Sequence, residues 1–168
     1  MKKILVLTLS LITLNSCETT PTEGCTDPLA VNYNRHANIN NNTCDFTADI
    51  LFYLSQDAAG TLYNSGVNKL TFYINEYNIG PQYADADGIF ISGYLTDPPE
   101  CWDINFTTGS FIWEDNSSTI VDLSAIDESG TVWFSEQMQL FANECLTVGI
   151  TSNNSGPILY LKGSQENN

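Results

Sequence analysis

Residues 69–75, KLTFYIN, decide the fold class of this 168-residue chain. Leu70, Phe72 and Ile74 alternate with Thr71 and Tyr73, which is the two-residue period of a β-strand with one buried face. Outward from this stretch, short β-rich runs recur between Gly, Asn, Asp and Ser residues. The expected strands are Asp49–Leu54, Lys69–Asn75, Gly88–Leu95, Trp102–Thr107, Ser110–Trp113, Thr119–Ala125, Thr131–Phe141, Cys145–Thr151 and Ile158–Lys162.

The residues between these runs also favour an all-β fold. The stretch Asp127-Glu128-Ser129-Gly130 predicts a hairpin turn, and no run of ten or more residues has helical periodicity. We therefore expect an antiparallel β-sandwich over residues 47–163, followed by a polar tail at 164–168. Such a sandwich is immunoglobulin-like, or transthyretin-like as the second resemblance described below implies.

The first sixteen residues have the layout of a secretory signal. Lys2 and Lys3 precede the apolar run Ile4–Leu14, which is shorter than the roughly 20 residues of a membrane-spanning helix. The run ends in Leu14-Asn15-Ser16-Cys17, which resembles the lipobox of bacterial lipoproteins. This resemblance implies cleavage after residue 16 and attachment of a diacylglyceryl group to the Cys17 thiol. The alternative is an ordinary signal peptide followed by an incidental cysteine.

The charge of the chain excludes one class of partner. Cleavage after residue 16 removes Lys2 and Lys3, so three basic residues remain against twenty acidic ones and the net charge is −17. Such a surface repels nucleic acid, and we exclude nucleic-acid binding. The acidity favours solubility over a specific cationic ligand.

The cysteines predict disulfides. With Cys17 carrying lipid, Cys25, Cys44, Cys101 and Cys145 remain, and export would place them in an oxidising compartment. Four cysteines allow three connectivities. Cys25–Cys44 and Cys101–Cys145 are favoured because each pair stays within one segment. A zinc site is disfavoured, because the chain has no Cys-x-x-Cys and a single histidine.

A short tether, residues 17–23, precedes a separate small unit at residues 24–46. The stretch Gly24–Cys44, GCTDPLAVNYNRHANINNNTC, resembles a module of exported bacterial proteins with the form GCTDPxAxNYNPxAxxxDGSC. The family's proline position is Arg35 here, and its acidic and glycine positions before the last cysteine are Asn40, Asn41 and Asn42. The loss of the acidic side chains would weaken any calcium binding, because affinity falls with ligand charge. We expect a disulfide-pinned spacer, with no metal or other cofactor; a calcium site is the alternative.

Residues 48–151 have a looser resemblance to a second family. The pattern includes Ala48 and Phe52, Leu70–Ile74, Pro99 and Cys101, Gly109–Trp113, Gly130–Trp133 and Cys145–Val148. It is similar to small β-sandwich domains of exported bacterial proteins with a transthyretin-like or carboxypeptidase-regulatory-like architecture. This resemblance implies a fold and no activity.

No catalytic constellation is expected. His36 is the only histidine, and we expect it to be exposed in a loop. The carboxylate pairs that could serve hydrolysis are common by chance in so acidic a chain, and the Asp85–Gly88 stretch matches only part of an EF-hand loop. These pairs are Asp85 and Asp87, Glu114 and Asp115, and Asp127 and Glu128.

The expected function is therefore that of a non-catalytic lipoprotein of the bacterial cell envelope, at the outer membrane or cell surface. Its lipid would hold it to the membrane, and its role would be structural, adhesive or accessory to another envelope protein. The alternative is a lipoprotein that captures polysaccharide through exposed aromatic rings. Because aromatic residues must fill a small core, we expect at least two of Trp102, Trp113 and Trp133 to be largely buried.

Overall fold

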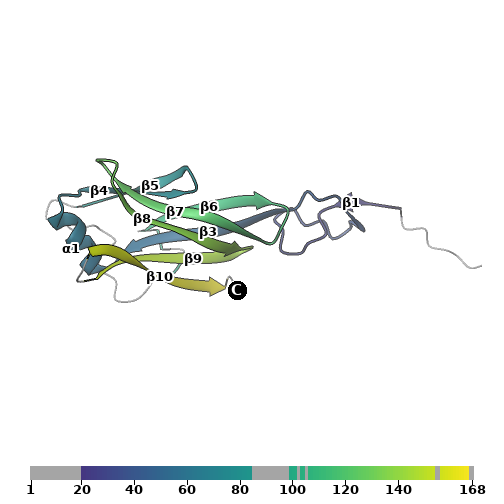
Figure 1. Ribbon diagram of the computed structural model, residues 1–168. Coiled ribbons are helices and arrows are strands. Elements are labelled where there is room, and N and C mark those ends of the chain that lie inside the picture. Colours follow the sequence, from purple (N-terminus) through teal and green to yellow (C-terminus); the bar gives the residue numbers. More distant parts are fainter. Residues whose placement is uncertain (1–19, 85–98, 102, 105, 154–155, 167–168) are drawn as a thin grey trace, which may run out of the picture.

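The computed structural model describes residues 20–84, 99–101, 103–104, 106–153 and 156–166, with only the backbone for 152–153 and 156–166. Figure 1 shows an elongated molecule in which a β-sandwich is the main body. The small unit that contains β1 lies at one end of the long axis, and the helix α1 lies at the other. The chain therefore enters at the end of the molecule that is farthest from α1.

Most elements of the structure are β-strands. Two short strands precede the sandwich, which has eight strands and one helix in the described residues. In chain order the elements are β1 (Glu23–Gly24), β2 (Ile39–Asn40), β3 (Asp45–Leu54), α1 (Gln56–Asn64), β4 (Lys69–Ile74), β5 (Tyr77–Tyr83), β6 (Thr107–Glu114), β7 (Ser118–Asp127), β8 (Val132–Phe141), β9 (Glu144–Asn153) and β10 (Gly156–Glu166).

Two four-stranded sheets form the sandwich, which confirms the predicted all-β class. One sheet has the order β10-β9-β3-β6 and the other β5-β4-β7-β8. All pairings within these sheets are antiparallel except β3 with β9, which is parallel from Asp49 opposite Cys145 to Leu54 opposite Ile150. The chain reaches β9 from β8 in the other sheet and not through a hairpin from β3, so a parallel pairing is sterically open.

The core lies between the sheets, and the alternating residues of β4 are at its centre. Leu70, Phe72 and Ile74 of β4 are fully buried, as are Ile50 and Phe52 of β3. The Phe52 and Phe72 rings stack across the two sheets with centroids 4.7 Å apart. The residues whose alternation predicted this strand therefore form the face of β4 that is buried in the core.

The sheet that contains β3 is buried on its outer face as well. Leu51 and Tyr53 have the opposite parity to the core residues of β3, yet they are 0% and 6% exposed. Cys145 and Thr147 of the neighbouring β9 are also buried. Residues 50–54 of β3 are therefore all buried, one after another.

Several sequence predictions need correction. The chain forms the helix α1 where none was expected, because Ser55 caps it and Ala58, Ala59 and Leu62 bury one side. Strand β5 was not predicted. The expected strand Trp102–Thr107 is wrong in its described part, because Asp103 and Phe106 donate turn hydrogen bonds and strand β6 begins only at Thr107.

The remaining differences are at boundaries. The strand expected at Gly88–Leu95 lies outside the described residues. Strand β3 begins at Asp45, inside the range assigned to the small unit, and β10 extends to Glu166, where Ser164 pairs with Leu146.

Candidate functional site

The small unit at residues 24–44, called the module below, is organised around its disulfide. Cys25 and Cys44 are bonded, with Cα atoms 4.9 Å apart, which confirms the predicted pair. Strands β1 and β2 pair in parallel beside it, and both cysteines are buried. Gly24 is tightly enclosed, because an added Cβ would lie 3.0–3.2 Å from Asn34 and Ala37.

Hydrogen bonds join the module to the sandwich. The Asn32 side chain donates to the Thr43 carbonyl (2.6 Å) and to an Asp45 carboxylate oxygen (2.8 Å), and it accepts from the Asp45 N–H (3.0 Å). The Val31 N–H donates to the Asp45 carbonyl at 2.8 Å. The first residue of β3 is thus bonded to the module through its N–H, its carbonyl and its side chain.

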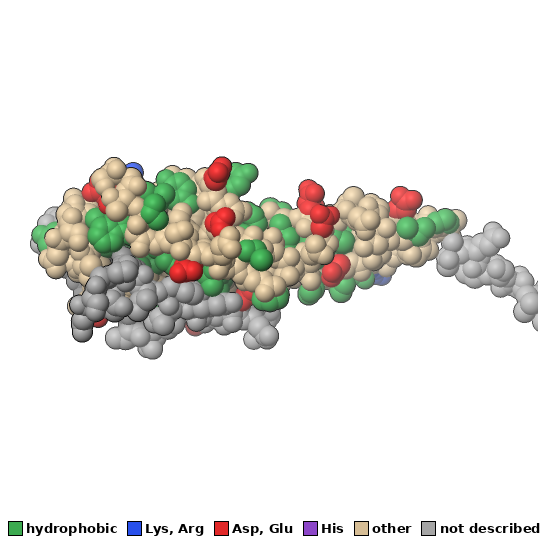
Figure 2. Space-filling view, in the orientation of Figure 1, with side chains coloured by type: hydrophobic (Ala, Val, Ile, Leu, Met, Phe, Trp, Pro, Cys, Tyr) green, Lys and Arg blue, Asp and Glu red, His purple; other side chains and the backbone are tan. Residues whose placement is uncertain are grey.

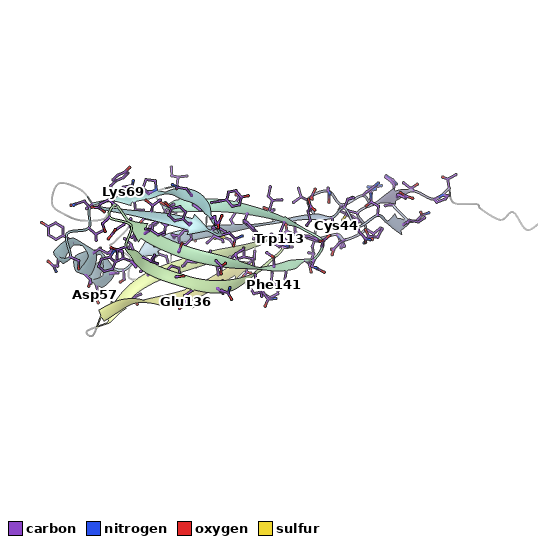
Figure 3. All side chains as sticks on the ribbon, turned by 45° about the horizontal axis from the view of Figure 1, so that its top comes forward. Cys44, Asp57, Lys69, Trp113, Glu136 and Phe141 are labelled. Atoms are coloured by element: carbon purple, nitrogen blue, oxygen red, sulfur yellow. A yellow bond between two sulfur atoms is a disulfide. The ribbon has the colours of Figure 1, made fainter. Side chains whose placement is uncertain are left out.

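A second set of contacts reaches the other loops at this end of the sandwich. The Asn143 side chain donates to the Leu29 carbonyl at 3.0 Å, and the Asp115 N–H donates to the Cys44 carbonyl at 3.3 Å. Ala30 and Cys44 belong to the same buried cluster as the sandwich core. Figure 3 shows Cys44 and Trp113 toward the module end, with Lys69 and Asp57 at the opposite end. The module is therefore packed onto the sandwich and continues its long axis.

The second disulfide lies on the outer face of the β3 sheet. Cys101 and Cys145 are bonded, with Cα atoms 6.1 Å apart, which confirms the other predicted pair. Four residues after Cys145, β9 carries Gly149 directly opposite Tyr53. The Tyr53 ring lies over Gly149 so closely that an added Cβ would collide with it. Burial of this ring raises the pKa of the Tyr53 hydroxyl.

The predicted lipidation residue, Cys17, lies outside the described residues. Over the part of the chain that the structure describes, the longest helix is α1, and no helix has the length and apolarity to cross a membrane.

The catalytic candidates do not assemble into a site. His36 is exposed in a module loop, as predicted, and only its backbone N–H is bonded, to the Asn34 side chain. Glu114 and Asp115 are exposed at the end of β6, and Asp85 and Asp87 lie outside the described residues. Among the described residues, no three His, Cys, Asp or Glu side chains lie close enough together to hold a metal ion.

The stretch Asp127–Gly130 forms the predicted hairpin turn between β7 and β8. Asp127 accepts hydrogen bonds from Ser129, the Thr131 N–H and the Trp133 indole. Partial burial raises the pKa of Asp127, but these bonds from Ser129, Trp133 and Thr131 outweigh that effect and hold it well below its ordinary value. The carboxylate is therefore structural: it fixes the turn and the N–H edge of the Trp133 ring.

The neighbouring carboxylate has the same kind of role. The pKa of Glu128 is lowered by hydrogen bonds from the backbone N–H groups of Asn68, of Glu128 itself and of Lys69. Both Asn68 and Lys69 lie at the start of β4, so Glu128 ties the turn to the adjacent strand. Asp127 and Glu128 together stabilise the turn between β7 and β8 and join it to the start of β4, at the end of the molecule that carries α1.

The structure describes two of the three tryptophans whose burial was predicted. Trp113 is buried, and its indole N–H donates to the Asn116 carbonyl at 2.6 Å. Trp133 is half-buried against the core, and Trp102 lies outside the described residues. The expectation of two largely buried rings is met by Trp113 alone among the described residues. The indole N–H groups of Trp113 and Trp133 are both bonded within the protein.

A surface hollow was not anticipated from the sequence. It has a volume of about 590 Å³ and is lined by Asn75, Glu76, Tyr77 and Asp122. Asn75 has φ +54°, and it exchanges backbone and side-chain hydrogen bonds with the backbone of Asp122. Tyr77 is 71% exposed. The one sequence signal was Asn75-Glu76 directly after a strong strand, which indicates a turn but not a concave surface.

No protein-family model, no curated protein and no solved structure matches this chain.

Proposed function

We propose that the protein is a lipoprotein of the bacterial cell envelope, anchored through Cys17, that holds a non-catalytic β-sandwich at a fixed distance from the membrane. The module is the spacer and the sandwich is the interaction domain. The observation that carries the proposal is the junction: the module shares a core and a set of hydrogen bonds with β3 and with the loops around it.

The placement of the ends supports this role. The lipobox-like residues precede the module, and the module lies at the end of the long axis opposite α1 (Figure 1). A chain anchored at Cys17 would therefore direct α1 and the turn at Asp127–Gly130 away from the bilayer. A flexible linker at the junction would give no such direction.

The chemistry of the described residues supports a binding role over a catalytic one. A general acid or base needs a perturbed pKa near a reacting group, usually through burial. Glu76 and Asp122, the carboxylates beside the hollow, are both exposed. The strongly lowered pKa of Asp127 is explained by its role in the turn.

Polysaccharide capture remains the second candidate, with the hollow as its specific support. An exposed tyrosine beside amide and carboxylate groups is suitable for stacking on a sugar ring and bonding its hydroxyls. Tyr77, Asn75, Glu76 and Asp122 supply those groups. Trp113 offers less support, because it is buried. Glycan-array binding that is lost in Tyr77→Ala and retained in Tyr63→Ala, which changes an exposed tyrosine of α1, would favour this function.

The lipid anchor is tested by expressing the full chain in a bacterial host and measuring the mass of its mature N-terminal peptide. We expect a diacylglyceryl-modified Cys17 and a protein that stays with the membrane fraction. Cys17→Ser should remain unmodified and leave that fraction. An unmodified wild-type N-terminus would overturn the proposal.

A further inference from the structure

The module has an unusual surface for its size. Four of the twelve exposed large hydrophobic side chains of the described residues lie within its 21 positions: Leu29, Val31, Tyr33 and Ile39. Their exposed fractions are between 46% and 66%. Figure 2 shows hydrophobic side chains on the module end of the molecule, including its outermost part. A unit with so small a core would gain stability by burying these groups, yet they face solvent.

The charge distribution separates the module from the sandwich. Residues 24–44 carry one acidic and one basic residue, Asp27 and Arg35, and have a net charge of zero. Residues 45–168 carry seventeen acidic residues against Lys69 and Lys162, and have a net charge of −15. The module is thus the part of the mature chain that an anionic membrane surface repels least.

The tether places the module next to the bilayer. Six residue steps separate Cys17 from Glu23, where β1 begins, and a fully extended chain of that length spans about 20 Å at most. The polar headgroup layer of one leaflet is several ångströms thick. A lipid on Cys17 would therefore allow the apolar side chains of the module to reach the membrane interface.

We propose that the module docks on the membrane interface through Leu29, Val31, Tyr33 and Ile39. The occupant of this surface is the lipid bilayer that holds the Cys17 lipid, so the inference rests on the proposed anchor. Tyrosine and aliphatic side chains are suited to the boundary between headgroups and acyl chains. The tether contributes Glu18 and Glu23, so the contact is apolar and not electrostatic. Docking would give the lipid-anchored protein a second contact with the bilayer.

The test uses the lipidated full chain in phosphatidylcholine vesicles with and without brominated phosphatidylcholine, which quenches tryptophan on contact. Tyr33→Trp adds a probe to the module, and Ile120→Trp adds a matched probe to β7, where Ile120 is 67% exposed. We expect the added fluorescence of Tyr33→Trp to fall at least twofold with brominated lipid, and that of Ile120→Trp to be unchanged. The quenching should be the same in low and high salt, because the contact is apolar.

A further pair of substitutions separates docking from mere proximity. Adding Leu29→Ser and Ile39→Ser to the Tyr33→Trp chain should remove most of the quenching while the lipid keeps the protein on the vesicle. Val31→Trp serves as the probe if circular dichroism shows that Tyr33→Trp does not fold. Vesicle-bound protein without quenching at either probe would overturn the docking alone, and would leave the surface for a protein partner. An unmodified Cys17 would overturn the anchor and the docking together.

Discussion

Substitution of Asn32 tests the junction between the module and the sandwich. Its side chain makes three hydrogen bonds, two of them to Asp45 and one to the Thr43 carbonyl. A net contribution at the lower end of about 0.5–1.5 kcal/mol per bond is appropriate, because Asn32 is exposed and water replaces the lost partners. Asn32→Ala should therefore weaken the local junction by about 1.5 kcal/mol, which is three bonds at about 0.5 kcal/mol each.

Hydrogen exchange of a single amide reads out this loss. The Val31 N–H is bonded to the Asp45 carbonyl across the junction and exchanges only when that contact opens. A weakening of about 1.5 kcal/mol corresponds to roughly a tenfold loss of protection, since 1.4 kcal/mol is a factor of ten. Protection of sandwich amides such as Leu51 should not change.

Two variants make the result specific. Asn64→Ala removes an exposed asparagine side chain from the end of α1 and should leave Val31 protection unchanged. Asn32→Asp should be worse than Asn32→Ala at neutral pH, because it places a second carboxylate where an amide now lies 2.8 Å from the Asp45 carboxylate. Unchanged Val31 protection in Asn32→Ala would refute the assigned role of these bonds.

Three further predictions concern the sandwich. Asp127→Ala should lower the free energy of unfolding by about 1–2 kcal/mol at pH 7. Because the folded-state pKa of Asp127 is lowered, its contribution is complete above the unfolded-state value near 4 and declines progressively below it, so the wild type and Asp127→Ala should converge in urea denaturation at low pH. Gly149→Ala should cost about 1–3 kcal/mol, because the new Cβ meets the buried Tyr53 ring. Replacing both Cys101 and Cys145 with alanine should cost about 4 kcal/mol in thermal or urea unfolding, since their bond closes a loop of 44 residues in the unfolded chain.

Each of these changes has a control. Gly60→Ala in α1 adds a Cβ in open space and should be neutral or stabilising, in contrast to Gly149→Ala. Glu136→Ala removes an exposed acid from β8 and should not show the loss that Asp127→Ala shows at pH 7. Equal effects of Gly60→Ala and Gly149→Ala would contradict the close packing of Tyr53. A pH-independent loss in Asp127→Ala would contradict the role of its ionised form.

The sequence reveals most of the sandwich because its strands have one clear inner face. In β4, apolar side chains at Leu70, Phe72 and Ile74 alternate with others because successive side chains of a strand point to opposite faces of the sheet, and one of these faces is the core. Strand β5 lacks this signal: it contains Gly80 at φ +141° and Pro81, and a bulge interrupts its pairing with β4. Proline and glycine are tolerated there because β5 is an edge strand.

Other elements depend on partners that are distant in the sequence. Helix α1 has only nine residues, and its buried face of Ala58, Ala59 and Leu62 is too short to give a periodic signal. The parallel pairing of β3 with β9 depends on how the chain crosses between the sheets. A local pattern cannot encode such a crossing.

Some features of the candidate site could also be predicted from the sequence, and others could not. The two disulfides were predictable because cysteine chemistry and segment boundaries limit the pairings. The junction was not, because it depends on hydrogen bonds between Asn32 and Asp45 and between Leu29 and Asn143, and amide side chains carry no sequence signal for such partners. The hollow beside Asn75 likewise arises from a turn geometry that only the fold defines.

Residual dipolar couplings of the mature chain in a weakly aligned medium test the rigid connection of module and sandwich most directly. Backbone N–H couplings from residues 24–44 and from strands β3, β4, β7 and β8 would be fitted separately to the structure. We expect both sets to give the same alignment tensor in orientation and magnitude, because the shared core and hydrogen bonds at Asp45 allow no independent motion. A module tensor of clearly smaller magnitude or different orientation would show a flexible junction and would contradict the spacer role.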